Sequence, residues 1–386
     1  MAPTSDLAVV GAGIVGLATA FAALERGASV RVFERGVPGN AQSGGDARVF
    51  RHAHDDSRLV ALAVESRALY RDWEERFGVE LVSGDGALLL GPAAPRRLPA
   101  MQAAGVRAWE ADGAEVAERL PLLAPLDGPA LFDADGGSIR AAAAIDALAG
   151  AIGDGLVADE ALALWPTGRG TVEIRSGGGR SEHGAAVICA GRESARLARG
   201  LGLAIPVELS LHGRVTFALR APLGAPAASL QNSGAQLGEP DAYGAASPGD
   251  ERFSLGVAES IAVRDDGSAI DPPALAQVTE RAVAYVRHAL PGLDPEPVAF
   301  RHCWVTALPW HPDGFAAWDA DGVLVAAGDN LFKHAPVFGR ALARAALEGY
   351  VPEELRPGAE LGRPLSLGAG SASTPANAVT ITQRSQ

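Results

Sequence analysis

The fold is decided by the stretch Leu7-Ala8-Val9-Val10-Gly11-Ala12-Gly13-Ile14-Val15-Gly16. Its first four residues are apolar and predict a buried parallel strand, and the residues after it continue an apolar helical face. Gly11 permits a tight turn between strand and helix, and Gly13 lets the backbone approach a pyrophosphate. Gly16 lets the helix pack closely on the strand. The spacing therefore predicts a dinucleotide-binding βαβ unit.

A second strand and an acidic residue complete this unit. Residues 29–33 form the second strand, and Glu34 follows roughly 20 residues after the glycines, where a carboxylate can accept hydrogen bonds from a ribose. Ile14 and Val15 at the helix N-terminus, and Arg35 beside the acid, are further candidates for contact with the nucleotide. A glycine-rich turn without a ligand is the alternative. The motif leaves open whether the nucleotide is FAD or NAD.

Composition narrows the class of protein. The 386 residues are 48% hydrophobic and 20% charged, which predicts a folded chain of two domains at about 150 residues per domain. The formal net charge of −13 argues against nucleic acid as a partner, because binding it needs a basic face. Two cysteines are too few for a disulfide scaffold, so we expect a cytoplasmic protein. We expect no membrane segment, because the apolar run of residues 7–24 carries the glycine motif.

The rest of the chain predicts an α/β protein, with a Rossmann-like nucleotide-binding domain and an inserted, mainly β substrate domain. Helices are expected over residues 57–77, 140–152, 279–290 and 340–347, and strands over 79–90, 185–189, 214–219, 253–258, 298–305 and 322–327. The nucleotide-binding domain would comprise residues 1–78, 133–208 and 308–365. The substrate domain would comprise residues 79–132 and 209–307. Residues 366–386 are small and polar, and we expect a flexible tail there.

Four motifs identify a resemblance to a known family. They are the N-terminal fingerprint, Ser43-Gly44-Gly45-Asp46-Ala47-Arg48-Val49-Phe50-Arg51-His52, His302-Cys303-Trp304-Val305-Thr306, and Gly328-Asp329-Asn330-Leu331-Phe332-Lys333. In this order they resemble the D-amino acid oxidase superfamily, and within it monomeric sarcosine oxidase and pipecolate oxidase. The resemblance implies FAD as the cofactor, a two-domain fold, and oxidation of a C–N bond in a small amine that carries a carboxylate.

The resemblance assigns roles to the first loop and its arginines. The segment containing Ser43, Gly44 and Asp46 matches a family loop that crosses above the flavin. Arg51 would bind the substrate carboxylate through two hydrogen bonds, and Arg48 would lie beside the flavin ring. The alternative is that these arginines are solvated surface charges.

Lys333 is the one lysine among the 33 basic residues, and the resemblance makes it a second cation for the substrate carboxylate. A compact ammonium can persist where a guanidinium does not fit, although a solvated loop lysine is the alternative. Around it, Gly328, Asn330, Leu331 and Phe332 would contact FAD. Gly191, which follows the strand over residues 185–189, is a further expected FAD contact.

Two cysteines receive different interpretations. Cys303 matches the cysteine that, in sarcosine-oxidase-like members, is linked covalently to the 8α-methyl carbon of the flavin. That chemistry needs a thiolate, which Arg301 or His302 could favour. The alternative is a small buried apolar side chain, and for Cys189 we expect that role.

The sequence departs from the family pattern inside the expected site. Counting from the pair Tyr243-Gly244, of which Tyr243 would line the pocket, Ser254 stands where the family has an oxygen-activating lysine. Two family histidines are replaced by Ala258 and Gly44. These small residues predict a roomier pocket and slower reaction of the reduced flavin with oxygen. Arg252, on the same face of the expected strand as Ser254, could substitute for the lysine.

The sequence thus predicts an FAD-dependent oxidase that cleaves the C–N bond of a secondary or N-substituted α-amino acid larger than sarcosine. Its partners would be a small amine with a carboxylate and molecular oxygen, with no metal ion. The first alternative is an FAD-dependent dehydrogenase with another electron acceptor, and the second is a non-catalytic flavin-binding module. The oligomeric state stays open.

Overall fold

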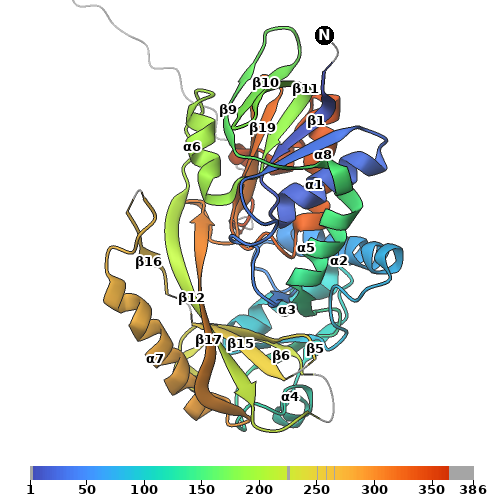
Figure 1. The fold of residues 1–386 in the computed structure, drawn as a ribbon. Helices are drawn as coiled ribbons and strands as arrows, with labels where there is room; N and C mark the ends of the chain where they lie inside the picture. The colour runs from blue at the N-terminus through green and yellow to red at the C-terminus, as the bar shows by residue number, and fades with distance from the viewer. Residues whose placement is uncertain (1–2, 224–226, 250, 258, 265, 365–386) are drawn as a thin grey trace, which may run out of the picture.

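The structure is a computed structural model that describes residues 3–223, 227–249, 251–257, 259–264 and 266–364 (Figure 1). Ala258 and the expected tail over residues 366–386 lie outside the described residues. The predicted α/β architecture is confirmed, and two large sheets organise it.

The first sheet has eight strands and carries the glycine-rich turn. Its order is β18-β19-β11-β1-β2-β8, with β10 and β9 continuing from β11. The strands β8, β2, β1, β11 and β19 run parallel, and the others pair antiparallel. Their bounds are β1 (Ser5–Val10), β2 (Val30–Glu34), β8 (Leu156–Ala158), β9 (Ala161–Pro166), β10 (Val172–Ser176), β11 (Gly179–Ile188), β18 (Phe315–Ala320) and β19 (Val323–Gly328).

Helices pack beside this sheet because their apolar faces match its buried strands. The helix α1 packs against α8 and α5, and α2 packs against α8 (Figure 1). Among the described residues, no helix is both long enough and apolar enough to cross a membrane. The bounds are α1 (Ile14–Glu25), α2 (Ser57–Phe77), α5 (Ala141–Ile152), α6 (Ser194–Arg199) and α8 (Ala335–Glu348).

The second sheet has nine strands in the order β16-β12-β15-β14-β13-β4-β6-β5, and β17 also pairs with β12. The helix α7 packs against β17, β12 and β15 (Figure 1). The bounds are β4 (Ala87–Leu90), α3 (Ala93–Ala103), β5 (Ala108–Glu110), α4 (Gly113–Arg119), β6 (Ala130–Asp133), β12 (Glu208–Leu219), β13 (Ser229–Asn232), β14 (Ala242–Ala246), β15 (Arg252–Val257), β16 (Ile261–Ala262), α7 (Pro272–Ala289) and β17 (Leu293–Ala307).

Smaller elements complete the chain. In the two-stranded ribbon of β3 and β7, Arg48 lies within β3, and Arg51 directly follows this strand. Its bounds, and those of the short 3₁₀ helices, are β3 (Ala47–Phe50), β7 (Gly137–Arg140), η1 (Gly153–Gly155), η2 (Gly191–Glu193), η3 (Ala235–Leu237), η4 (Glu353–Leu355) and η5 (Pro357–Ala359).

Most expected elements form, with shifted ends. The helix predicted over residues 57–77 has those bounds in the structure, whereas α7 and α8 begin earlier than predicted. Both have a proline in their first turn, where the missing N–H costs nothing. Of the strands expected over residues 79–90, only β4 forms fully, because Gly86 turns the chain with a φ of +80° just before it.

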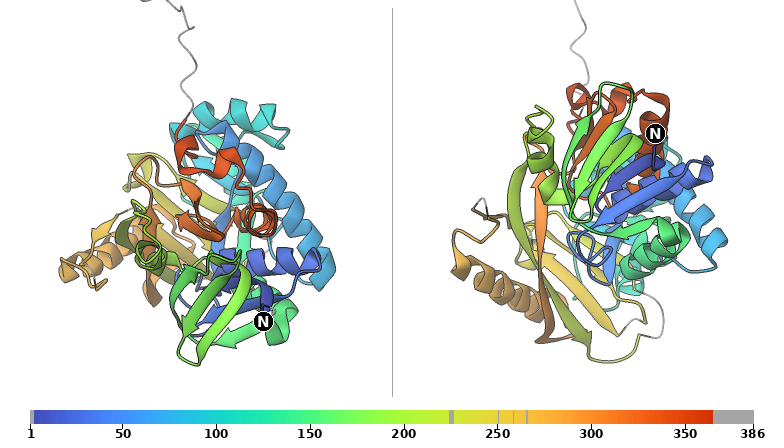
Figure 2. Two further views of the ribbon diagram at one scale, coloured as in Figure 1. Left: turned by 90° about the horizontal axis from the view of Figure 1, so that it is seen from above. Right: turned by 45° about the horizontal axis from the view of Figure 1, so that its top comes forward.

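The long strands β12 and β17 pair with each other in the second sheet, and β17 also contacts β19 of the first (Figure 1 and the right view of Figure 2). The first sheet draws on residues 5–34, 156–188 and 315–328, and the second on residues 87–133 and 208–307. The domain boundaries given above stay a prediction.

The close packing of α1 on α8 predicts that one added methyl group between these helices lowers the stability of the fold. A Cβ at Gly339 of α8 would lie 2.6 Å from the Cβ of Ala18 on α1, so Gly339→Ala must separate the helices. We expect a cost of about 1–3 kcal/mol in the free energy of unfolding, as for other overpacked cores. Thermal unfolding of the purified variant measures it as a lowered midpoint.

Gly150 in α5 is the matched control, because a Cβ there meets no atom within 4 Å. Gly150→Ala should raise the midpoint, since alanine is favoured over glycine in a helix by about 0.5–1 kcal/mol. Equal midpoints for the two variants would contradict the close approach of α1 and α8.

Candidate active site

A cavity of about 1010 Å³ lies where the two sheets meet. Its wall includes the β1–α1 turn, the loop over residues 39–43, parts of β12, β14 and β17, and the segment over residues 326–333. This volume is at the upper end of the roughly 300–1,000 Å³ of ligand pockets, so it suits a large cofactor together with a small substrate.

The β1–α1 turn requires glycine at two positions. Gly11 has a φ of +99°, and a Cβ there would lie 2.6 Å from the carbonyl oxygen of Cys189. A Cβ at Gly16 would collide with the carbonyl oxygen of Gly11, so the first turn of α1 can lie against the strand only with glycine there. Gly13, Ile14 and Val15 line the cavity, whereas Gly16 packs behind it.

Two side chains fix the backbone N–H groups of this turn. The Ser43 hydroxyl accepts from the N–H of Ile14 at 3.0 Å, and Oε2 of Glu34 accepts from the N–H of Ala12 at 2.8 Å. Glu34 and Arg35 both line the cavity. A carboxylate has about four lone-pair sites, so Glu34 keeps capacity for the hydroxyls of a ribose.

Gln42 is a structural residue of the site that the sequence did not reveal. Its Oε1 accepts from the N–H of Arg192 at 3.0 Å, and its Nε2 donates to the carbonyl of Trp304 at 3.1 Å and to the Thr306 hydroxyl at 3.2 Å. A Cβ at Gly191, which has a φ of +55°, would collide with Oε1 of Gln42. The amide therefore holds three distant segments together at the cavity wall.

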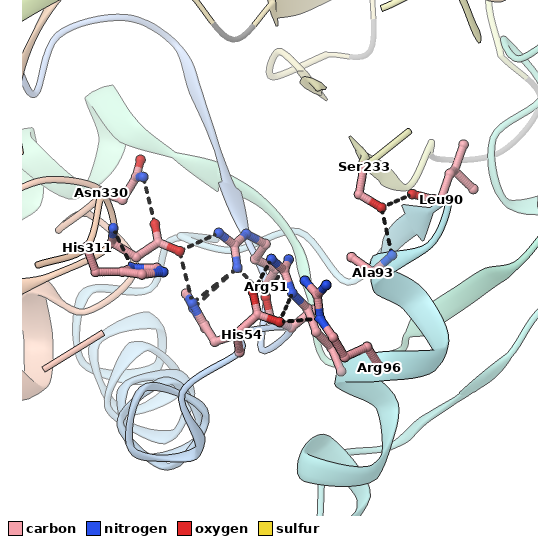
Figure 3. A network of polar contacts seen from close by, with 12 residues as sticks. Arg51, His54, Leu90, Ala93, Arg96, Ser233, His311 and Asn330 are labelled. Carbon is pink, nitrogen blue, oxygen red and sulfur yellow. Dashed lines mark hydrogen bonds and ion pairs between the residues drawn. The ribbon is translucent and has the colours of Figure 1, made fainter. Parts of the chain in front are cut away.

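The carboxylate of Asp313 is the centre of a polar network (Figure 3). Its Oδ2 lies 2.9 Å from Nη2 of Arg51 and 3.2 Å from Nδ1 of His54. Its Oδ1 accepts from Asn330 at 2.7 Å and lies 3.8 Å from Nζ of Lys333. Burial opposes ionisation of Asp313, but the charges of Lys333 and Arg51 outweigh it and hold its pKa well below the usual range.

Arg51 and Lys333 both line the cavity and are not solvated surface charges. Lys333 is only 5% exposed and donates to the carbonyl of Asn330 at 3.2 Å. Burial lowers the pKa of Lys333 to about 8, although Asp313 acts in the opposite direction. Asp313 neutralises part of the charge of these two cations, and the sequence did not reveal this partner.

Arg48 and Tyr243 line the cavity on the side of the second sheet. Arg48 donates to the carbonyl of Ala47 at 2.8 Å, and its Cζ lies 5.8 Å from the centroid of the Phe332 ring. Burial, and then the charge of Arg214, lower the pKa of Arg48 to about 9, so it stays charged at neutral pH. Gly328, Asn330 and Leu331 line the cavity too, as does Gly191.

Both cysteines border the cavity, although only Cys303 was expected to do so. Cys303 lies on β17 opposite His212 of β12, and its thiol is close enough to Arg48 for their charges to interact. Burial raises the pKa of Cys189 to about 12, so this thiol stays protonated.

Several expected site residues do not line the cavity. Asp46 is exposed, and Ser254 is buried with its hydroxyl 3.0 Å from that of Thr216. At Gly44 the guanidinium of Arg301 fills the space that a side chain would take, so this glycine does not enlarge the pocket. Arg252 is exposed at the start of β15, so it does not substitute for the missing lysine as suggested.

Two further acids in the cavity wall, which the sequence did not reveal, have raised pKa values. Burial, with a contribution from Asp313, raises the pKa of Asp329 to about 6, and its carboxylate accepts backbone hydrogen bonds from Thr306 and Asn330. Burial also raises the pKa of Asp241, which lies near Arg51 and Arg97. Within the described residues, no group of three His, Cys, Asp or Glu side chains could hold a metal ion.

Comparison with known proteins finds a similar sequence and several similar folds. The monomeric sarcosine oxidase of Streptomyces avermitilis is 29% identical over 224 residues, which are 54% of this chain and 57% of that protein. Similar solved structures include NikD, an unusual amino acid oxidase essential for nikkomycin biosynthesis (TM-score 0.76, 23% identity, 90% of this chain and 94% of that one). L-proline dehydrogenase from P. horikoshii has a TM-score of 0.79 at 19% identity, over 95% of this chain and all of that one (100%).

The sarcosine oxidase alignment covers little more than half of that protein, and the solved structures share the fold alone. The match to a family description is broader, because residues 6–345 fit the DAO family of FAD dependent oxidoreductases. That range holds the glycine turn, the Arg51 loop, Cys303 and Lys333, which the structure brings together around one cavity. The chain therefore belongs to the DAO family of FAD dependent oxidoreductases.

Proposed function

We propose that the protein uses FAD to oxidise the C–N bond of a secondary or N-substituted α-amino acid larger than sarcosine. Dioxygen accepts the electrons and becomes hydrogen peroxide. The observation that carries this proposal is the convergence of Arg51 and Lys333 on one carboxylate, that of Asp313, in the cavity wall. The two cations are close enough together to hold a single carboxylate between them.

Asp313 shapes how a substrate would bind. With Arg51 and Lys333 charged and Asp313 ionised, these three groups keep one net positive charge. One positive charge suits a substrate with one carboxylate better than one with two. The guanidinium has five N–H donors and the ammonium three, so both can serve Asp313 and a substrate carboxylate together.

The residues of the first sheet fit FAD as the nucleotide. The glycine turn leaves the backbone of Gly13, Ile14 and Val15 facing the cavity, where the helix N-terminus favours a pyrophosphate. Glu34 would hold the ribose, and Gly328 to Lys333 would lie along the flavin. When bound, FAD supplies the acceptor for the hydride that leaves the carbon attached to nitrogen.

The substrate amine must be neutral before that carbon loses a hydride. The positive charges of Arg51 and Lys333 lower the pKa of a nearby ammonium, and Asp313 offsets part of that effect. Asp329 lines the same cavity, and with a pKa of about 6 its carboxylate can accept the released proton near neutral pH. The product imine then hydrolyses in water to an amine and a carbonyl compound.

The preference for a substrate larger than sarcosine is supported by the lining beyond Arg51. Gln231, Asp241 and Arg97 also line the cavity, so it extends past the two cations as a polar pocket. The expected widening by Gly44 does not contribute, because Arg301 fills that space.

The second candidate function is an FAD-dependent dehydrogenase with another electron acceptor, which the serine at position 254 favours. Oxygen consumption with N-substituted glycines and cyclic α-amino acids separates the two. The proposal predicts one hydrogen peroxide per carbonyl product, with larger amino acids faster than sarcosine. Turnover with a dye acceptor and without peroxide would favour the dehydrogenase, and no turnover at all would favour a non-catalytic flavoprotein.

Lys333→Met should raise the KM for the amino acid about 30-fold or more, because truncating one partner of a buried charge pair costs at least about 2 kcal/mol. Steady-state kinetics on the flavin-loaded variant measures the change. Arg340→Met is the control, since Arg340 is exposed on α8 and pairs with Glu65 away from the cavity. An unchanged KM for Lys333→Met would remove this residue from the substrate site.

The pH profile gives a second test of Lys333. The pKa of Lys333 is about 8 in the free protein, so its side chain is a charged ammonium below that pH and a neutral amine above it. In the wild type, kcat/KM should therefore fall as the pH rises through about 8, while deprotonation of the substrate amine acts in the opposite direction. The fall should be absent in Lys333→Met, and a fall that persists there belongs to another group.

The flavin should be attached covalently to Cys303. Cys303 lines the cavity from β17, and the reaction with the 8α-methyl group requires a sulfur nucleophile at this wall. Acid precipitation should give a yellow pellet for the wild type and for Cys189→Ser, and a white pellet under a yellow supernatant for Cys303→Ser. A yellow supernatant from the wild type would exclude the covalent link and leave FAD binding intact.

A further inference from the structure

The cationic side chains of the cavity divide into two groups. Those of the first group are ion-paired: Arg35, Arg192 and Arg196 with Glu193, Arg97 with Asp55, and Arg51 and Lys333 with Asp313. The second group is Arg48, Arg214 and Arg301, which have no carboxylate within 4.0 Å among the described residues. Within the described residues, no carboxylate therefore pairs directly with this group.

These three arginines lie together. Arg48 and Arg214 both donate from Nη1 to the carbonyl oxygen of Ala47, at 2.8 Å and 3.3 Å. Arg301 donates to the carbonyl of Asn40 at 2.7 Å and occupies the space beside Gly44. Uncharged carbonyl groups hold all three guanidinium groups, so the cluster keeps its positive charge at the cavity wall.

The sheet register explains how Arg214 reaches this position. Tyr243, Gly256, Arg214 and Arg301 form one row across β14, β15, β12 and β17. Gly256 has no side chain, and a Cβ there would collide with the Tyr243 ring. The ring therefore lies across β15, with its centroid 5.6 Å from Cζ of Arg214.

Ser254 belongs to the neighbouring row of the same sheet. It pairs with Thr216 of β12, two residues from Arg214 and on the same face of that strand. Position 254 on β15 has a serine where the family has a lysine. Arg214 on the adjacent strand β12 provides a positive charge instead, and unlike Ser254 it lines the cavity.

The proposed reaction contains one step that such a charge can assist. The substrate loses a hydride from carbon, which carries two electrons and one proton, and a second proton from nitrogen. Dioxygen gains the two electrons and two protons and becomes hydrogen peroxide. Its first electron produces superoxide, an anion that has not yet gained a proton, and a fixed cation nearby stabilises this charge.

We propose that Arg214, supported by Arg48 and Arg301, is the cation that stabilises superoxide in this cavity, from β12 instead of the β15 position occupied by Ser254. This role rests on the proposed function only in its choice of dioxygen as acceptor. It assigns Arg214 to the oxygen half of the reaction, and Arg51 and Lys333 to the amine half.

The test needs no amine substrate. The flavin of the purified holoprotein is photoreduced without oxygen, with EDTA as the electron donor. It is then mixed with buffer containing dioxygen and followed by its absorbance as it is reoxidised. Arg214→Met should slow reoxidation roughly 100-fold, comparable to removal of one donor to a developing anion. Arg214→Lys should restore most of the rate because it keeps the charge. Arg252→Met, a change at an exposed arginine of β15, should match the wild type.

A second measurement observes the anion site without turnover. Bromide added to the oxidised holoprotein should perturb the visible flavin spectrum in the wild type and in Arg252→Met, and much less in Arg214→Met. Reoxidation of Arg214→Met at the wild-type rate would overturn the proposal, as would wild-type reoxidation no faster than that of free reduced FAD. Because the electrons come from EDTA under light and not from an amino acid, an enzyme that oxidises no amino acid still gives a result for Arg214.

Discussion

The structure depends on the charge balance around one buried carboxylate, that of Asp313. Arg51 follows β3, Lys333 follows β19, and Asp313 precedes β18, so three separate segments meet through it. Charged side chains as buried as Lys333 persist only with a partner, because leaving water costs several kcal/mol per ion. Asp313 allows two cations to remain at the cavity wall, and it sets the net charge that a substrate meets.

The same cavity contains a second, different electrostatic environment. Around Asp313, the cations Arg51 and Lys333 are ion-paired, and the three groups keep one net positive charge for an anionic substrate. Around the Ala47 carbonyl the guanidinium groups of Arg48 and Arg214 have no ion pair within the described part of the chain, and backbone carbonyls accept their hydrogen bonds. The first environment suits a carboxylate that stays charged throughout. The second environment suits an anion that forms during the reaction. The two environments also differ in the strands that contribute their residues.

Local features were predictable from the sequence, and distant pairings were not. The turn at Gly11 follows from neighbouring residues, and so does α2, whose apolar period and limits lie within one segment. No pattern in the neighbouring sequence pointed to Asp313 as a site residue, because its partner Arg51 is 262 residues away. Alternation put Arg252 on the right face of β15 but could not show that this end is exposed. Gly44 predicted open space, and only the fold brings Arg301 into it.

The proposed function requires that the protein recognise an amino acid by its carboxylate and oxidise its C–N bond. The most direct measurement is an anaerobic titration of the visible flavin absorbance with pipecolate and with piperidine, which lacks only the carboxylate. We expect that the cyclic amino acid bleaches the flavin and that the amine without a carboxylate leaves it oxidised. Equal bleaching by both would contradict the role of Arg51 and Lys333, and bleaching by neither pipecolate nor any other secondary amino acid would contradict the proposed reaction.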